Sequence, residues 1–181
     1  MKTILATLML LACSTLPPTM QDVLQARVTF KVERIDGGSG CGFPISGTEI
    51  LTAWHVVEGL PAHCVSVMGL YPTKIEQVGE LDAAILTFPE ANFQAWPLDN
   101  RAVSPAETVY ASGHGAGFHW WSRGLGTLDP TRVSLDIAPG DSGGALLDSE
   151  GDVLGILVAR GYYANHHCYI VPITEVIANL P

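Results

Sequence analysis

The stretch IAPGDSGGALLDSEGDVLGILVA, residues 137–159, places a small polar cluster, GDSGG, directly before two apolar, strand-like runs joined by a turn. Glycine at positions 140, 143 and 144 permits a tight backbone whose amide groups can point at a substrate carbonyl. Ser142 lies at the centre of this cluster. A glycine-rich turn alone would be an ordinary hairpin, so the interpretation of Ser142 depends on what the rest of the chain supplies.

Short apolar runs of strand length continue on both sides of this stretch and fall into two groups. They lie at 26–34, 40–46, 49–54, 64–70, 73–79 and 82–88, and again at 108–113, 119–128, 131–137, 143–148, 152–159 and 168–173. A polar, proline-containing connector at 89–106 separates the groups. This pattern predicts an all-β fold of two packed six-stranded antiparallel β-barrels, at about 26–88 and 107–181, with a short C-terminal helix.

The first residues, MKTILATLMLLACSTL, combine one lysine, a short apolar stretch and small residues before a cysteine, which is typical of a secretory signal. The last four of these before Ser14, LLAC, resemble a bacterial lipobox. We therefore expect residues 1–12 to be a lipoprotein-type signal peptide and Cys13 to be lipidated, in preference to an ordinary secretory signal. Residues 13–25 would then be a tether. Ser14 after the cysteine favours an outer-membrane lipoprotein facing the periplasm, with secretion as the alternative.

The charge of the chain restricts its partners. It has 9 Lys and Arg against 18 Asp and Glu, a net charge of −9, and loss of Lys2 with the signal peptide leaves 8 against 18, or −10. Phosphate binding needs cationic surface, so a nucleic-acid partner is not expected. No run of 18 apolar residues is present, so membrane contact is expected only through the N-terminal lipid anchor.

A serine becomes a nucleophile at neutral pH when a histidine base, an orienting carboxylate and oxyanion donors surround it. His55 follows an apolar run in ILTAWHVV, and Asp82 opens the run DAAILTF, where a carboxylate is partly desolvated and needs a donor. His55 is a candidate for that donor, and the amides of Gly140 and Ser142 are candidates for the oxyanion hole. Taken singly, His55 could instead be a core histidine and Asp82 a solvated strand-start residue.

The segments GSGCGFPIS, ILTAWHVV, LDAAILTF, SRGLGTL and IAPGDSGGALLDSEGDVLGILVA resemble, in this order, the chymotrypsin-fold serine peptidases, especially the compact bacterial trypsin-like group that includes the HtrA proteases. The resemblance covers about residues 26–180. It implies a serine endopeptidase of polypeptide substrates, without cofactor, in which His55 is the general base, Asp82 its orienting partner and Ser142 the nucleophile. The alternative is a catalytically inactive, protease-like binding module of the cell envelope.

The G-x-S-x-G elbow of α/β-hydrolases also fits Gly140, Ser142 and Gly144. That family runs serine, acid, histidine along the chain, whereas here His55 and Asp82 both precede the serine. The elbow must also open a helix, and the residues that follow it here are typical of strand, turn and strand. We therefore do not adopt the hydrolase interpretation.

Export leaves three cysteines besides Cys13, and Cys41 and Cys64 enclose His55. We expect a Cys41–Cys64 disulfide, worth on the order of 3 kcal/mol by loop closure, with two buried thiols as the alternative. A metal site at His63 and Cys64, or at residues 166–168, is not expected, because adjacent side chains on a strand point to opposite faces.

The resemblance also bears on specificity and maturation. Asp136 has the spacing from Ser142 at which trypsin-like members place the carboxylate that binds Lys or Arg, and Arg160 falls in the stretch expected to wall the same pocket. Since Arg160 could pair with Asp136 or block basic side chains, we expect small or apolar residues before the cut, with basic residues next. No activation cleavage site is recognisable, so Asp141 is expected to bond to a backbone amide or an arginine instead of a new amino terminus.

Overall fold

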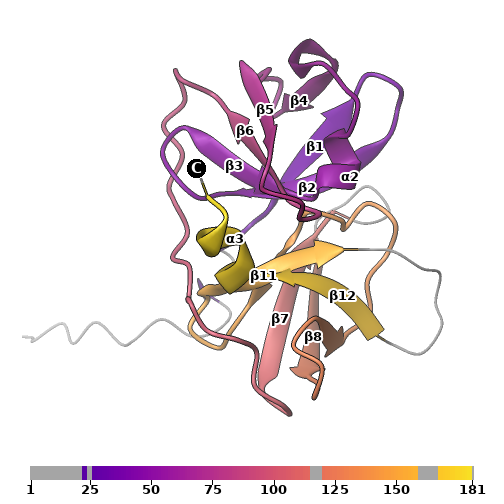
Figure 1. The fold of residues 1–181 in the computed structure, drawn as a ribbon, viewed down its shortest axis with the longest axis vertical. Coiled ribbons are helices and arrows are strands. Elements are labelled where there is room, and N and C mark those ends of the chain that lie inside the picture. Colours follow the sequence, from indigo (N-terminus) through magenta and orange to yellow (C-terminus); the bar gives the residue numbers. More distant parts are fainter. Residues whose placement is uncertain (1–21, 24–25, 115–119, 159–166, 181) are drawn as a thin grey trace, which may run out of the picture.

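The computed structural model describes residues 22–23, 26–114, 120–158 and 167–180 of the chain. Two antiparallel six-stranded units are stacked one on the other, and the chain fills the first before it enters the second (Figure 1). The expected all-β fold of two six-stranded halves is therefore confirmed. The predicted signal peptide and most of the predicted tether lie outside the described residues.

The first unit has the strand order β4-β1-β2-β3-β6-β5. Its strands are β1 (Phe30–Arg34), β2 (Ser39–Pro44), β3 (Glu49–Thr52), β4 (Val65–Val67), β5 (Lys74–Gln77) and β6 (Ala84–Thr87). The edge strands β4 and β5 are not hydrogen-bonded to each other, so the unit is an open half-barrel where a closed barrel was expected. Two single-turn helices interrupt it, α2 (Trp54–Val57) and the 3-10 helix η1 (Ala62–Cys64).

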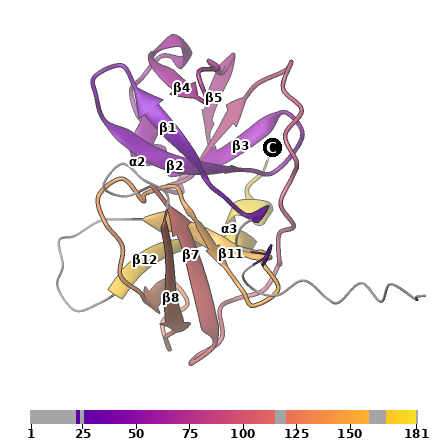
Figure 2. The same cartoon turned by 180° about the vertical axis from the view of Figure 1, so that it is seen from behind.

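The second unit is a closed barrel in the order β10-β11-β12-β9-β8-β7. Its strands are β7 (Thr108–Gly113), β8 (Trp120–Gly126), β9 (Arg132–Ser134), β10 (Ala145–Leu147), β11 (Val153–Val158) and β12 (His167–Pro172). The expected C-terminal helix is α3 (Ile173–Ala178), which contacts β11 and β12. Seen from behind, β1 and β2 lie above β7 and β8 (Figure 2).

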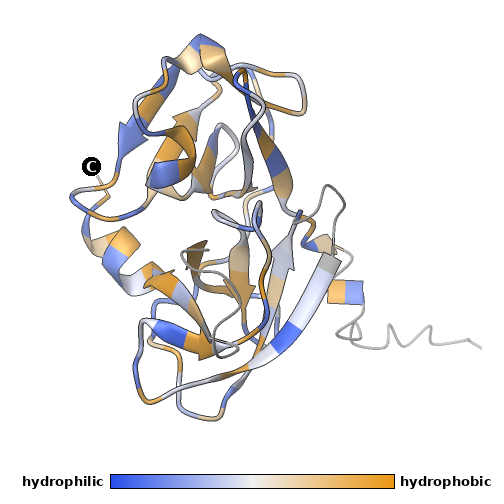
Figure 3. Cartoon of the chain, turned by 90° about the vertical axis from the view of Figure 1, so that its right-hand side faces the viewer, coloured by the Kyte–Doolittle hydropathy of each residue, from blue (hydrophilic) through white to orange (hydrophobic). Residues whose placement is uncertain are grey.

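One apolar cluster joins the two units. It contains Phe43, Leu51 and Leu86 of the first unit together with Ile156 of β11 and Ile173 of α3, all at least 95% buried. Hydrophobic and hydrophilic residues alternate along many strands (Figure 3), as expected where one face of a strand meets a core and the other meets water. Burial of this shared cluster fixes the two units against each other, and the candidate site lies at their junction.

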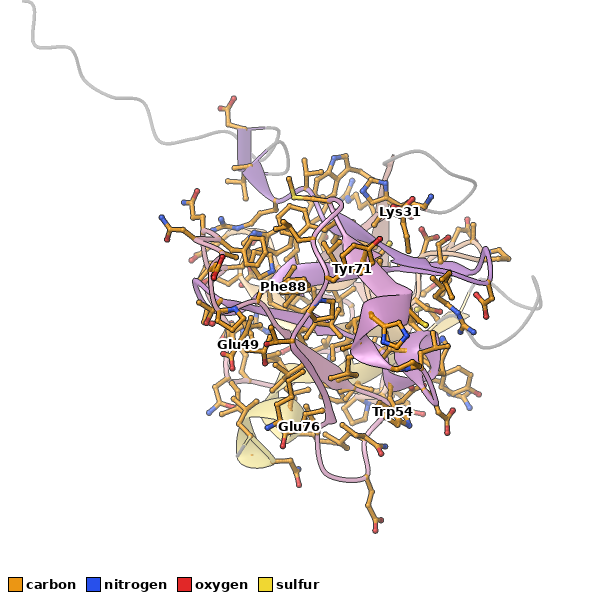
Figure 4. All side chains as sticks on the ribbon, turned by 90° about the horizontal axis from the view of Figure 1, so that it is seen from above. Lys31, Glu49, Trp54, Tyr71, Glu76 and Phe88 are labelled. Carbon is orange, nitrogen blue, oxygen red and sulfur yellow. The ribbon has the colours of Figure 1, made fainter. Side chains whose placement is uncertain are left out.

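The described ranges contain no helix with the length and apolar character needed to span a lipid bilayer. Several large apolar side chains are nevertheless exposed at the end of the first unit remote from the second. Met68 and Tyr71 are 70% and 63% exposed, and Tyr71 is labelled in the view from this end (Figure 4).

Candidate active site

His55 is held by the short helix α2, which Ala53 alone separates from the end of β3. Ala53, the residue before the helix, is still extended and fully buried, and Val56 and Val57 are buried behind the histidine. These anchors fix the backbone at His55, whose side chain stays 25% exposed. The sequence ILTAWHVV therefore folds so that a strand and a buried valine pair present one imidazole at the surface of the junction.

Asp82 meets His55 from the turn that precedes β6. Its Oδ2 lies 2.9 Å and its Oδ1 3.0 Å from Nδ1 of the imidazole, and Oδ1 also accepts the backbone N–H of His55 at 2.9 Å. A carboxylate only accepts hydrogen bonds, so Nδ1 carries the hydrogen and Nε2 of the neutral ring keeps its lone pair. This is the tautomer that a general base requires.

Ser142 lies in the loop before β10 and is 94% buried. Its carbonyl accepts the N–H of Cys41 in β2 at 2.7 Å, while the next amide, that of Gly143, donates to Leu157 in β11 at 2.8 Å. Cys41 belongs to the first unit and Leu157 to the second. The loop is therefore fixed from both sides of the junction.

Gly40 shows how closely the serine and histidine segments approach. A Cβ atom at Gly40 would lie 2.6 and 2.7 Å from the two methyl groups of Val56, the neighbour of His55, and 2.8 Å from the carbonyl oxygen of Ser142. Only a residue without a side chain fits between them. The structure therefore places the segments that carry His55 and Ser142 on either side of a single glycine.

The residues before Ser142 form a tight turn. The N–H of Asp141 donates to the Ala138 carbonyl at 3.0 Å, and Gly140, at the third position, has φ +99°. A positive φ at this position defines a type II turn and explains the glycine. The turn is closed a second time, because the Ala138 N–H donates to Oδ2 of Asp141 at 2.6 Å. The fully buried Asp141 thus bonds to a backbone amide, as predicted.

These features match a known family. A sequence model of the family described as trypsin-like peptidase domain matches residues 38–156, about two thirds of the chain. The chain belongs to the trypsin-like peptidase domain family. A comparison with curated proteins gave no match.

Solved structures of proteases share the fold. The inactive form of the Rv3671c protease of M. tuberculosis has a TM-score of 0.75 at 22% identity, with 87% of this chain and 90% of that chain covered. A serine endoprotease from Yersinia pestis has a TM-score of 0.74 at 20% identity, with 90% and 65% covered. The HtrA-type protease AlgW with a tripeptide has a TM-score of 0.70 at 20% identity, with 89% and 62% covered.

The structure describes only one of the two predicted pocket residues of this trypsin-like domain. Asp136 is exposed on the segment that follows β9, whereas Arg160 lies outside the described residues, so their pairing stays a prediction. The structure adds a shallow groove that the sequence did not indicate. Asp82 lines it together with Val158 of β11 and three consecutive residues of β12, Tyr169, Ile170 and Val171.

The predicted Cys41–Cys64 disulfide is wrong, because neither cysteine is bonded to another. In the sheet, β1 lies between β2, which carries Cys41, and β4, which follows Cys64. Cys41 is opposite Lys31, whereas the Cys64 carbonyl accepts the N–H of Ile35, four residues further along. Two strand spacings of about 5 Å and this offset of about 13 Å separate the cysteines. A disulfide needs Cα atoms within about 7 Å.

The other cysteine contacts were not anticipated either. Cys41 is fully buried and bonds across the junction to the turn before Ser142, and Cys168 of β12 is buried in the second barrel. Among the residues that the structure describes, no three His, Cys, Asp or Glu side chains are grouped as ligands of a metal ion.

Proposed function

We propose that the protein is a serine endopeptidase that cleaves peptide bonds through an acyl-enzyme on Ser142. The observation that carries this proposal is that the backbone N–H and the ring Nδ1–H of His55 both donate to the Asp82 carboxylate, which leaves the ring Nε2 as a base. Membership of the trypsin-like peptidase domain family supports the same assignment.

The proposed reaction begins when Nε2 of His55 takes the Ser142 hydroxyl proton and Oγ attacks the carbonyl carbon of the scissile bond. The carbonyl oxygen becomes an oxyanion, stabilised by the amides of Gly140 and Ser142. When the tetrahedral intermediate collapses, His55 returns the proton to the leaving amine. Water, deprotonated by the same nitrogen, then attacks the acyl-enzyme and releases the second product and the free serine.

A fluorophosphonate probe tests this proposal without a known substrate, because it phosphonylates an activated serine. We expect the wild-type protein to be labelled, the Ser142→Ala variant to be unlabelled, and His55→Ala to be labelled far more slowly. Circular dichroism of each variant shows whether the fold is kept. A folded wild-type protein that never labels would favour the protease-like binding module instead.

For substrate preference, the proposal is that a small or apolar residue precedes the cut. Asp136 is exposed, and Arg160 is expected to lie where it could neutralise that carboxylate or exclude a cationic side chain. A panel of otherwise identical peptides that differ only at the residue before the cut tests this. Preferred cleavage after Ala, Val or Leu would support it, and preferred cleavage after Lys or Arg would contradict it.

For location, the proposal is an exported lipoprotein anchored through Cys13. The support is the apolar, cysteine-terminated stretch of residues 1–13 alone. Incorporation of labelled palmitate into the wild-type protein in a bacterial host, and its loss in Cys13→Ser, is the expected result. Equal labelling of the two proteins would contradict the anchor.

A further inference from the structure

The buried side chain of Cys41 bonds directly to the turn that precedes Ser142. Its Sγ donates to the carbonyl oxygen of Gly140 at 3.1 Å and accepts the backbone N–H of His114, the residue after β7, also at 3.1 Å. Its own N–H donates to the Ser142 carbonyl at 2.7 Å. One residue of the first unit therefore holds the loop of the second unit on both sides of Asp141.

Gly140 lies between two peptides of the turn. The peptide between residues 139 and 140 carries its amide, and the next peptide joins it to Asp141. That next peptide is fixed at both ends, since its carbonyl accepts from Cys41 and its N–H donates to Ala138. These two bonds hold the Gly140 end of the turn in place relative to Ser142, and the observed φ of +99° sets the direction of the Gly140 amide there.

We propose that Cys41 is a positioning residue for the oxyanion hole, whose S–H holds the Gly140 carbonyl and so keeps Gly140, with its amide, in place beside the Ser142 amide. This inference rests on the proposed peptidase function. Cys41 itself touches no substrate atom in the proposed reaction; it acts through the peptide that follows Gly140.

The chemistry of the thiol fits this role. Burial raises the pKa of the Cys41 thiol to about 12, and the negative charge of nearby Asp141 acts in the same direction. The group therefore stays protonated at neutral pH and remains a donor. A thiolate at this place would have no hydrogen to give to the Gly140 carbonyl.

The test compares Cys41→Ala, which removes the donor, with Cys41→Ser, which keeps one. Cys168→Ala is the matched control, because Cys168 is equally buried and its pKa is also raised to about 12 by burial, yet its Sγ bonds to the Tyr169 carbonyl of its own strand. Urea unfolding of all three variants measures the stability cost of truncating a buried cysteine separately from the effect on the turn.

For a cleaved peptide and a peptidyl boronic acid, which forms a tetrahedral adduct with serine, we expect Cys41→Ala to lower kcat and raise the boronate Ki. About tenfold is expected in each, less than the hundredfold or more that follows loss of an oxyanion donor itself. KM should change by less than about twofold, since the interaction is made in the transition state. Cys41→Ser should restore most of the loss, and Cys168→Ala should leave kcat and the boronate Ki near wild type.

A second readout needs no activity. In NMR spectra we expect the amide of Gly140 to give one sharp signal in the wild-type protein and exchange broadening in Cys41→Ala, with Cys41→Ser close to wild type. Wild-type kcat, boronate Ki and Gly140 signal in Cys41→Ala would overturn the inference, as would equal defects in the alanine and serine variants. Absence of fluorophosphonate labelling in the wild-type protein would overturn the peptidase proposal, and the role of Cys41 in catalysis with it.

Discussion

Replacement of Asp82 by asparagine tests how the carboxylate acts on His55. Asp82 Oδ1 accepts the His55 backbone N–H at 2.9 Å, and an asparagine oxygen can keep this bond. The asparagine NH₂ group then takes the place of Oδ2, 2.9 Å from Nδ1 of the ring. Because that group only donates, it forms a hydrogen bond with the ring only when Nδ1 accepts, and this bond moves the ring hydrogen to Nε2. The base would then carry a hydrogen where it needs a lone pair.

The expected loss is large. The wrong tautomer in this constellation costs about 10⁴-fold in rate, which corresponds to about 5 kcal/mol of transition-state stabilisation. The second-order rate of fluorophosphonate inactivation measures it without a known substrate. Asp36→Asn is the matched control, since Asp36 is an exposed carboxylate of the same unit that pairs with Arg34. An Asp82→Asn variant that is folded and reacts within tenfold of the wild-type rate would refute the tautomer argument.

Three further predictions concern stability and the cysteines. Gly143→Ala should destabilise the fold by about 3 kcal/mol or more and abolish fluorophosphonate labelling, because φ is +86° and a Cβ would lie 2.0 Å from the Cys41 carbonyl oxygen. Gly37→Ala is the control: its φ is +87°, but no atom lies within 4 Å of its Cβ position, so it should cost only about 1 kcal/mol. Equal losses of stability in urea unfolding would contradict this. A variant without Cys13 can be unfolded in iodoacetamide without reductant and weighed by mass spectrometry. We expect all three remaining cysteines to be alkylated, whereas a disulfide between two of them would allow only one to be alkylated. Arg101 lowers the pKa of Glu107 below its ordinary value of 4.5, chiefly by side-chain hydrogen bonds. The pair therefore stabilises the fold fully above pH 4.5, and this contribution is lost as pH falls below 4.5 and through the lowered pKa. Stability should then fall less below pH 4.5 in Glu107→Gln than in the wild-type protein, and parallel curves would contradict the assignment.

The strands and the main site candidates could be predicted from the sequence because each depends on a local pattern. Apolar runs of strand length between glycine and proline turns indicated the twelve strands found in the described residues, and β11 (Val153–Val158) lies within the run predicted at 152–159. The pairing of His55 with Asp82 was also anticipated, since a partly buried carboxylate needs a donor.

Features that depend on which strands become neighbours could not be predicted in this way. Only 22 residues separate Cys41 from Cys64 in sequence, but β1 lies between β2, which carries Cys41, and β4, which follows Cys64, and the spacing of the cysteines does not indicate that order. The bond from Cys41 to Gly140 spans 99 residues and joins two units that each look complete in sequence. The lack of space at Gly40 is likewise visible only once Val56 and Ser142 are in place.

A crystal structure of the wild-type protein with a peptidyl boronic acid would show whether Ser142 is the nucleophile. We expect a bond from boron to Oγ of Ser142, one boronate oxygen within hydrogen-bonding distance of the Gly140 and Ser142 amides, and the His55–Asp82 contact unchanged. A boronate bound to another residue, or a saturated crystal in which Ser142 carries no adduct, would contradict it.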